Sequence, residues 1–221
     1  TIGRRQRQMC IRDRDNVSPN VSMNCLISAG PTREWIDPVR FLSNPSSGKM
    51  GYALARAAVD RGMQVTLVSG PTALKAPAGA EVLFVETARE MQEAMSQRFA
   101  KADLIIMAAA VSDHSPETRS KQKQKKEQMR MTLDLVANPD ILMELGKQKK
   151  NGQTLVGFAA ETENLLPNAR RKLREKNLDW IVANDVSEKD RGFQSDFNKI
   201  SLLSKEQNEM DFEYQEKNSL A

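Results

Sequence analysis

Residues 24–58 read NCLISAGPTREWIDPVRFLSNPSSGKMGYALARAA, and this stretch decides the fold. The apolar run Cys25–Ala29 predicts a buried strand that ends at Gly30. A polar loop follows, and the glycine-rich turn 46–51 leads into the helical spacing of 52–59. A turn of this kind presents backbone N–H groups at a helix N-terminus, where the helix dipole also favours an anion. The stretch therefore predicts a nucleotide or phosphate cradle at the head of an α/β sheet.

The glycine turn matches neither common phosphate-binding motif. A Walker A loop needs a glycine where the chain has Ser43, and a serine or threonine where it has Met50. A G-x-G-x-x-G fingerprint is not found here either. Gly48 and Gly51 then have two readings, a tight helix entry or a close approach of a phosphate to the backbone.

Strands and helices alternate along the rest of the chain. Strands are expected at 64–68, 81–85, 103–110, 129–136, 154–159 and 179–183, helices at 52–61, 87–99, 138–147 and 165–176, and a C-terminal hairpin at 199–203 and 210–214. This order predicts a Rossmann-like, mostly parallel sheet flanked by helices. Ligands of such sheets bind beyond the carboxyl ends of the strands, so we expect 30–33 and 109–113 to share one rim.

Asn44 and Arg40 precede the glycine turn. The Asn44 amide could donate to an oxygen as charge develops on it, as in an oxyanion hole, or it could be a turn asparagine before Pro45. The Arg40 guanidinium could hold a phosphate or a carboxylate with two hydrogen bonds.

Two segments are rich in lysine. The run 121–126 lies in a polar stretch, 114–128, that predicts a mobile loop after the rim. Such a cationic flap can close over a triphosphate and neutralise charge during phosphoryl transfer, although a solvated loop is the alternative. Lys172 and Lys176 lie one turn apart on a predicted helix, where they could contact an anion or face solvent.

The net charge of +4 belongs mostly to the first 22 residues, which hold five arginines and two aspartates. The rest of the chain is nearly neutral, which argues against nucleic-acid binding by the body. Residues 1–22 show neither the helical nor the strand spacing of apolar residues, so we expect a disordered or extraneous tail, with an RNA-binding arm as the alternative. Residues 217–221 are expected to be a second tail.

Several function classes find no support in the sequence. No apolar run approaches the roughly 20 residues of a membrane span, and no signal pattern opens the sequence. His114 is the only histidine and no Cys/His cluster exists, so a zinc site, and with it any protein metal site, is not expected. Neither tyrosine has a lysine four residues on, which disfavours a short-chain dehydrogenase. We expect a cytoplasmic protein without a nucleic-acid or membrane partner.

Six spaced blocks together resemble the phosphopantothenoylcysteine synthetase family. They are GPTREWIDPVRFLSNPSSGKMG at 30–51, AAAVSD at 108–113, KQKK at 123–126, NPDI at 138–141, GFAAET at 157–162 and KNLDWIVANDV at 176–186. The resemblance covers nearly all of the chain after the tail and implies a synthetase domain at 23–216.

The resemblance implies a ligase of coenzyme A biosynthesis. It would join 4′-phosphopantothenate to L-cysteine through an acyl-cytidylate, using CTP with Mg²⁺ and releasing pyrophosphate and then CMP. It also implies a homodimer and, in bacteria, a fused or partner flavin-dependent decarboxylase. The rival hypotheses are an NAD(P)-binding oxidoreductase and a non-catalytic nucleotide-binding module.

The resemblance also assigns residues. It implies that Asn44 holds the acyl group for the second step with support from Arg40, and that Lys123 serves acyl-cytidylate formation, with Lys121 and Lys125 as alternatives in the same alternating run. Substrate contacts would be Arg40, Asn44 and Ala110. Nucleotide contacts would be Gly30, Ser47, Gly48, Met107, Ala108, Ala109, Asp113, Lys123, Pro139, Asp140, Ile141, Leu142, Phe158, Lys172 and Lys176.

Overall fold

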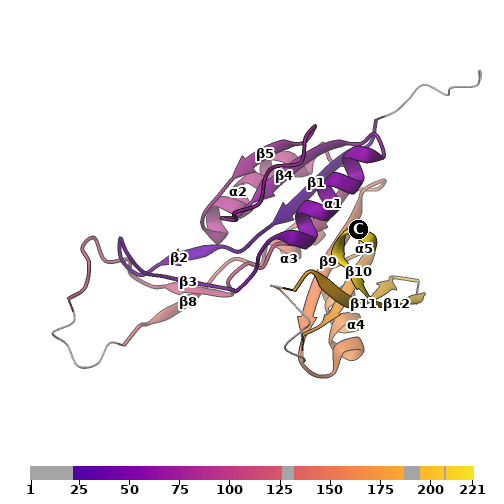
Figure 1. The fold of residues 1–221 in the computed structure, drawn as a ribbon. Helices are drawn as coiled ribbons and strands as arrows, with labels where there is room; N and C mark the ends of the chain where they lie inside the picture. The colour runs from indigo at the N-terminus through magenta and orange to yellow at the C-terminus, as the bar shows by residue number, and fades with distance from the viewer. Residues whose placement is uncertain (1–21, 126–131, 187–194, 207) are drawn as a thin grey trace, which may run out of the picture.

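The computed structural model describes residues 22–125, 132–186, 195–206 and 208–221. Its centre is one sheet of eight strands in the order β12-β11-β10-β9-β6-β1-β4-β5 (Figure 1). The strands are β1 (Asn24–Ala29), β4 (Gln64–Ser69), β5 (Glu81–Phe84), β6 (Leu104–Met107), β9 (Thr154–Glu161), β10 (Trp180–Asp185), β11 (Phe197–Ser204) and β12 (Glu209–Glu216). The strands from β10 to β5 pair in parallel, and β11 and β12 add an antiparallel hairpin at one edge. The predicted α/β architecture is confirmed.

The order of the strands reverses beside β1. The chain passes from β1 to β4 and β5 on one side, and then returns to β6, β9 and β10 on the other. The switch point therefore lies between β1 and β6, and ligands of open α/β sheets bind at the carboxyl ends of the strands at this point. A bridge between Pro31 and Ala110 joins the two segments that leave these strands, so the predicted rim is confirmed.

Helices cover both faces of the sheet. They are α1 (Lys49–Asp60), α2 (Ala88–Phe99), α3 (Ile141–Gln148), α4 (Leu165–Glu175) and the short α5 (Lys217–Leu220). Met91, Met95 and Leu173, from α2 and α4, are buried in one core cluster, while Tyr52 and Ala55 of α1 belong to a second. Apolar residues on opposite faces of β1, such as Leu26 and Ile27, divide between the two clusters, as expected of a central parallel strand.

Two small antiparallel sheets form an arm. They are β2 (Arg33–Trp35) with β3 (Phe41–Ser43), and β7 (His114–Pro116) with β8 (Leu135–Ala137). Figure 1 shows β2, β3 and β8 projecting together from the main sheet. Both segments follow the switch-point strands, so the arm begins at the rim.

The structure corrects three expected boundaries. The helix expected from Asn138 begins at Ile141, and Asp140 caps it by accepting a hydrogen bond from Met143 N at 3.0 Å. Asn138 is instead tied to Ser112 O through its side chain, and a residue before a proline is biased away from helical angles. The strand expected at 129–136 is present as β8 at its C-terminal end only, and 126–131 lie outside the described residues.

The third correction concerns the C-terminus. The expected tail 217–221 contains α5, which contacts α1, and Lys217 is buried. The expected N-terminal tail lies outside the described residues, apart from Ser22. None of the described helices is long and apolar enough to cross a membrane.

Candidate active site

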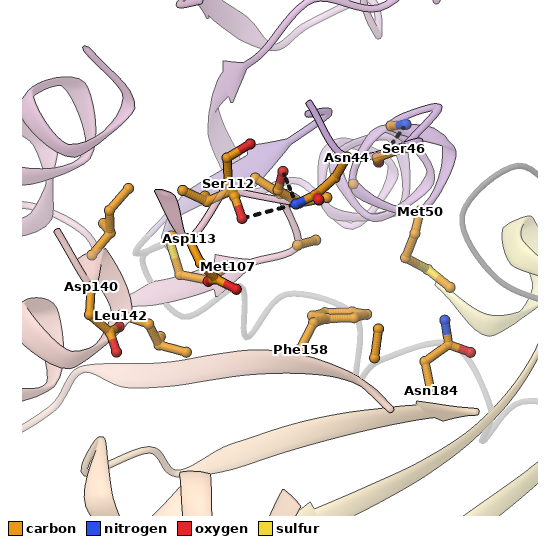
Figure 2. A pocket seen from close by; sticks show the side chains of 18 of the residues that line it. Asn44, Ser46, Met50, Met107, Ser112, Asp113, Asp140, Leu142, Phe158 and Asn184 are labelled. Carbon is orange, nitrogen blue, oxygen red and sulfur yellow. Dashed lines mark hydrogen bonds between the residues drawn. The ribbon is translucent and has the colours of Figure 1, made fainter. Parts of the chain in front are cut away.

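A cavity of about 520 Å³ opens at the switch point. Its lining comes from the glycine turn and α1, the segment after β6, the start of α3, the strands β9 and β10, and the basic face of α4. Figure 2 shows Asp140 and Leu142 on one side, Phe158 in the middle, and Met50 and Asn184 on the other side. Residues that follow β1 and residues of β6, β9 and β10 therefore line the same cavity.

The glycine turn faces this cavity with the N-terminus of α1. Gly48 has a left-handed backbone with φ of 79°, and a Cβ there would lie 2.7 Å from Cγ2 of Thr72. No side-chain hydrogen bond caps α1, and residues 48–51 at its N-terminus line the cavity, where the helix dipole favours an anion. Gly51 has a packing role as well, because a Cβ there would lie 2.5 Å from Cβ of Ala29 in β1. Both glycines are thus needed for packing in the turn, and the approach of a phosphate to its backbone stays a prediction.

Asn44 lies over the cavity in a fixed orientation. Its Nδ2 donates to Ala110 O at 3.3 Å and to Val111 O at 3.1 Å, as the dashed lines in Figure 2 show. Both N–H bonds of the amide are therefore occupied by the backbone after β6. The expected role as a donor to an oxyanion does not fit this geometry, and the oxygen Oδ1 is the atom left to contact a ligand.

Most positions that the family resemblance assigned to the nucleotide line this one cavity. They are Gly48, Met107, Ala108, Ala109, Asp113, Pro139, Asp140, Ile141, Leu142, Phe158, Lys172 and Lys176, together with Ala110 from the substrate set. Gly30 and Ser47 are not in the lining, although Cα of Gly30 would lie only 3.3 Å from a Cβ at Gly48. The fold thus gathers residues from five distant blocks of the sequence.

Lys172 of α4 and Lys176, which caps the C-terminus of this helix, are paired with acidic side chains. Lys172 Nζ lies 2.7 Å from a carboxylate oxygen of Glu161, and Lys176 Nζ lies 2.7 Å from Asp140. The predicted anion contacts are therefore made within the protein in this structure. A phosphate or a base carbonyl would have to compete with these carboxylates for the ammonium groups.

Arg40 does not line the cavity. Its guanidinium donates to Asp37 Oδ2 through Nε at 3.0 Å and to Gln124 O at 2.9 Å. Asp37 also accepts from Gln124 N at 3.2 Å, so the pair ties the arm to the lysine-rich loop. In this structure the Arg40 guanidinium therefore binds Asp37 and the carbonyl of Gln124, whereas it was expected to bind a phosphate or carboxylate of a ligand.

The ionisation of Asp37 follows from these contacts. Burial opposes its charge, but the hydrogen bonds from Arg40 and from the backbone N–H groups of Val39, Gln124 and Arg40 outweigh that effect. They hold the pKa of Asp37 well below its ordinary value of 3.8. The carboxylate is therefore charged at neutral pH and keeps its contacts with Arg40 and Gln124.

Lys123 is exposed and does not line the cavity. The same holds for Lys121 and Lys125, and 126–131 lie outside the described residues. Closure of a lysine-rich flap over the site remains a prediction.

The cavity also includes residues that the sequence reasoning did not select. Among them are Met50, Ser112, Asn138, Asn184, Asn198 and Lys217. Asn184 lies within a block that carried the family resemblance, so a signal for it existed. Lys217 had no signal, because the end of the chain lacks any apolar period.

Comparisons with known proteins give a consistent result. The family profile described as "DNA/pantothenate metabolism flavoprotein C-terminal domain" matches residues 21–221. A relative from Bacillus subtilis (strain 168), named coenzyme A biosynthesis bifunctional protein CoaBC, is 50% identical over 190 residues, which are 86% of this chain and 47% of the relative. The chain thus spans about half the length of the curated relatives it matches.

Solved structures agree with the sequence comparison. The crystal structure of the C-terminal domain of a CoaBC protein is 41% identical, with a TM-score of 0.76, covering 90% of this chain and 89% of that one. A Cab2 mutant in complex with phosphopantothenate-cysteine shares the fold at 18% identity, with a TM-score of 0.72 and coverage of 90% of this chain and 83% of that one.

Proposed function

The chain belongs to the family of DNA/pantothenate metabolism flavoprotein C-terminal domains, and from this premise we propose that it is a phosphopantothenate–cysteine ligase of coenzyme A biosynthesis. The observation that carries the proposal is the single cavity in which residues from five family blocks meet the N-terminus of α1. In such a site the N-terminus of α1 can hold a phosphate group of the ligand, and the side chain of Asn44 offers a neutral amide in the same cavity.

The reaction would proceed in two steps. The carboxylate of 4′-phosphopantothenate attacks the α-phosphorus of CTP, which forms an acyl-cytidylate and releases pyrophosphate. The amine of L-cysteine then attacks the acyl carbon, the C–O bond to CMP breaks, and the ammonium proton is lost as the amide forms. The enzyme needs to position the groups and to stabilise negative charge in the first step.

The described residues suit these tasks. The N-terminus of α1, which lines the cavity, would hold phosphate oxygens, and the ring of Phe158 lies in the middle of the cavity beside the nucleotide positions. Asn44 Oδ1 would accept a hydrogen bond from the attacking amine, since its Nδ2 is occupied. The loop of Lys123 would close over the triphosphate and neutralise its charge.

Mg²⁺ would arrive with the triphosphate. The described residues include no group of three or more His, Cys, Asp or Glu side chains that could hold a metal ion by themselves. Asp113 lines the cavity, which fits the usual binding of Mg²⁺ by one or two carboxylates and substrate phosphates. The ion would supply charge neutralisation on those phosphates.

A homodimer is the assembly we favour. Val39 and Phe41 of the arm are 56% and 39% exposed, and Leu135 and Val136 of β8 are 48% and 40% exposed. An apolar surface on a projecting arm suits a second copy of the chain. Because the named relatives are bifunctional and twice as long, a flavin-dependent decarboxylase domain or partner, in the cytoplasm, also belongs to the proposal.

The decisive experiment measures pyrophosphate release. Purified protein is mixed with 4′-phosphopantothenate and either CTP or ATP, with Mg²⁺, and cysteine is then added. We expect pyrophosphate before cysteine and amide product only after it, with CTP preferred.

Release of neither product with either nucleotide would overturn the ligase proposal. A change in nicotinamide absorbance would favour the oxidoreductase. Nucleotide binding without turnover, retained in Lys123→Ala, would favour the non-catalytic module.

A further inference from the structure

The lysine-rich loop is attached to the arm at two points within the described residues. At the first, Ser120 N donates to Ile36 O at 2.8 Å. At the second, four residues on, the backbone of Gln124 is held at both its N–H and its C=O. The segment 120–124 is therefore bound to the turn between β2 and β3, and Lys123 lies directly before the second attachment.

Asp37 and Arg40 make the second attachment. Asp37 Oδ2 accepts from Gln124 N at 3.2 Å, and Arg40 Nη2 donates to Gln124 O at 2.9 Å. Arg40 Nε also donates to Asp37 Oδ2 at 3.0 Å, so the three residues form one closed set of hydrogen bonds, which we call the clamp. Because the clamp uses the backbone groups of Gln124, it holds the main chain of the loop whatever side chain this position carries.

The two carboxylate oxygens of Asp37 have different roles. Oδ1 accepts from Val39 N at 2.8 Å and from Arg40 N at 2.9 Å, which are contacts of an Asx turn that an asparagine could also make. Oδ2 accepts from the Arg40 side chain and from Gln124 N, where an asparagine would place its own N–H groups against other donors. The turn alone therefore does not require a carboxylate, whereas the attachment of the loop does.

The burial of Asp37 points the same way. Its side chain is fully buried, although residues 38–40 beside it are exposed. A buried charge costs free energy unless it is paired and hydrogen-bonded, and Arg40 and Gln124 supply those partners from the side of the loop. The carboxylate is thus kept in an exposed turn by the contacts that bind the loop.

The clamp lies at one end of β3, and Asn44 lies at the other. Arg40 directly precedes this strand, and Asn44 follows its last residue, Ser43. Four steps of extended chain span roughly 13 Å, so a short, paired strand connects the clamp to the side chain that lies over the cavity. The clamp therefore fixes how far the main chain next to Lys123 lies from the cavity.

We propose that Asp37 is a positioning residue for the first step of the reaction: it holds the main chain of the lysine-rich loop at Gln124 and thereby sets where Lys123 meets the triphosphate. Asp37 acts through Lys123 and does not touch a substrate. The inference rests on the proposed function for the role of Lys123, whereas the attachment of the loop does not. Placement matters to the rate, since a shift of about 1 Å in a reacting group can cost about a hundredfold.

Hydrogen exchange and pyrophosphate release test this role in two variants. Asp37→Asn keeps an acceptor for the turn and loses the acceptor for the loop. Arg40→Gln leaves the Asx turn intact, and because this side chain is 42% exposed, it serves if Asp37→Asn does not fold. In each variant we expect faster exchange in a peptide that covers 119–125 and a roughly ten- to hundredfold slower release of pyrophosphate at saturating CTP. The affinity for CMP should equal that of the parent protein.

A double-mutant cycle tests whether Asp37 acts through Lys123. Calorimetry without 4′-phosphopantothenate measures CTP affinity in the parent protein, Asp37→Asn, Lys123→Ala and the double variant. Asp37→Asn should weaken CTP binding about fivefold or more in the parent protein and have no further effect when Lys123 is already replaced. A general loss of stability would instead weaken CTP binding by the same factor in both backgrounds.

Glu34→Gln is the matched control. Glu34 is also a buried carboxylate of the arm, 5% exposed, and accepts from a backbone N–H, but its donor is Ala88 of α2, at 3.0 Å. Gln124→Ala is the control on the loop, because it keeps both backbone groups that the clamp holds. Both controls should leave the exchange of 119–125 and the release of pyrophosphate unchanged.

Pyrophosphate release at the parent rate in folded Asp37→Asn would overturn the positioning role. Exchange of 119–125 at the parent rate, or an equal effect on CTP binding with and without Lys123, would also overturn it. A failure of the proposed function gives another pattern. In that case the parent protein releases no pyrophosphate from any nucleotide, yet the exchange of 119–125 still depends on Asp37.

Discussion

Asn44 is held by two hydrogen bonds that leave only its oxygen for a ligand. We predict that Asn44→Ala still releases pyrophosphate, because the first step does not need this oxygen, but forms the amide roughly a hundredfold more slowly. Separate assays of pyrophosphate and amide product measure the two steps. Asn168→Ala is the control, since that asparagine lies on α4, donates to Glu161 of β9 and is not part of the cavity lining. Amide formation at the parent rate in Asn44→Ala would remove Asn44 from the second step.

Asp37 offers a test at the same scale that depends on pH. Its pKa in the folded protein is depressed below 3.8, so its hydrogen bonds stabilise the fold above that pH, and this stabilisation is lost as the pH falls towards the folded value. Asp37→Asn should therefore lower the melting temperature near neutral pH, and the difference from the parent protein should shrink below about pH 4. Melting curves from pH 7 to pH 3 measure this. A difference that does not change over that range would contradict the charged clamp.

At the scale of elements, the apolar runs predicted the parallel strands because burial on both faces leaves a plain signal in sequence. The limits of that signal are visible at particular residues. The run from Asp103 to Ala110 continues past the end of β6, because Ala108–Ala110 leave the sheet to line the cavity. Asp140, rather than Asn138, caps α3, because a tertiary contact to Ser112 already uses the Asn138 side chain. The short α5 depends on packing against α1, which no local pattern could show.

Gly146 tests the packing of one helix on another. It lies inside α3, where alanine would ordinarily stabilise a helix, but a Cβ there would lie 1.9 Å from Lys176 O at the end of α4. We predict that Gly146→Ala lowers the free energy of unfolding by about 2–3 kcal/mol, as overpacking does. Denaturant titration measures the change. A variant as stable as the parent protein would show that α3 can move away from α4 without cost.

The lysine-rich loop gives the second prediction at this scale. Lys123→Ala should abolish pyrophosphate release, because the loop must bring positive charge to the triphosphate, whereas Asn44→Ala should not. Lys121→Ala and Lys125→Ala are matched controls in the same alternating segment, and all three lysines are exposed in this structure. If one of the controls loses the activity and Lys123→Ala keeps it, the register of the loop is shifted by one alternation.

At the scale of the whole molecule, the arm is the part that the body of the fold does not explain. Its strands β7 and β8 add His114 and Ala137 to the cavity lining, and the arm also carries exposed apolar side chains and the contact between Arg40 and the lysine-rich loop. An arm that joins two copies of the chain and also holds the lysine-rich loop would make the position of this loop at the active site depend on formation of the dimer. The alternating pattern of 129–136 could not predict this arrangement, since within the described residues 132–137 only Leu135–Ala137 form a strand.

The oligomeric state tests this coupling. We predict that Val136→Glu, which places a charge among the exposed apolar residues of the arm, converts a dimer into a monomer, as measured by light scattering coupled to size exclusion. Phe84→Glu is the matched control, because Phe84 is 74% exposed on β5, at the edge of the main sheet, and is not part of the arm. It should leave the mass unchanged. A dimer that persists in Val136→Glu and dissociates in Phe84→Glu would move the interface from the arm to the edge of the sheet.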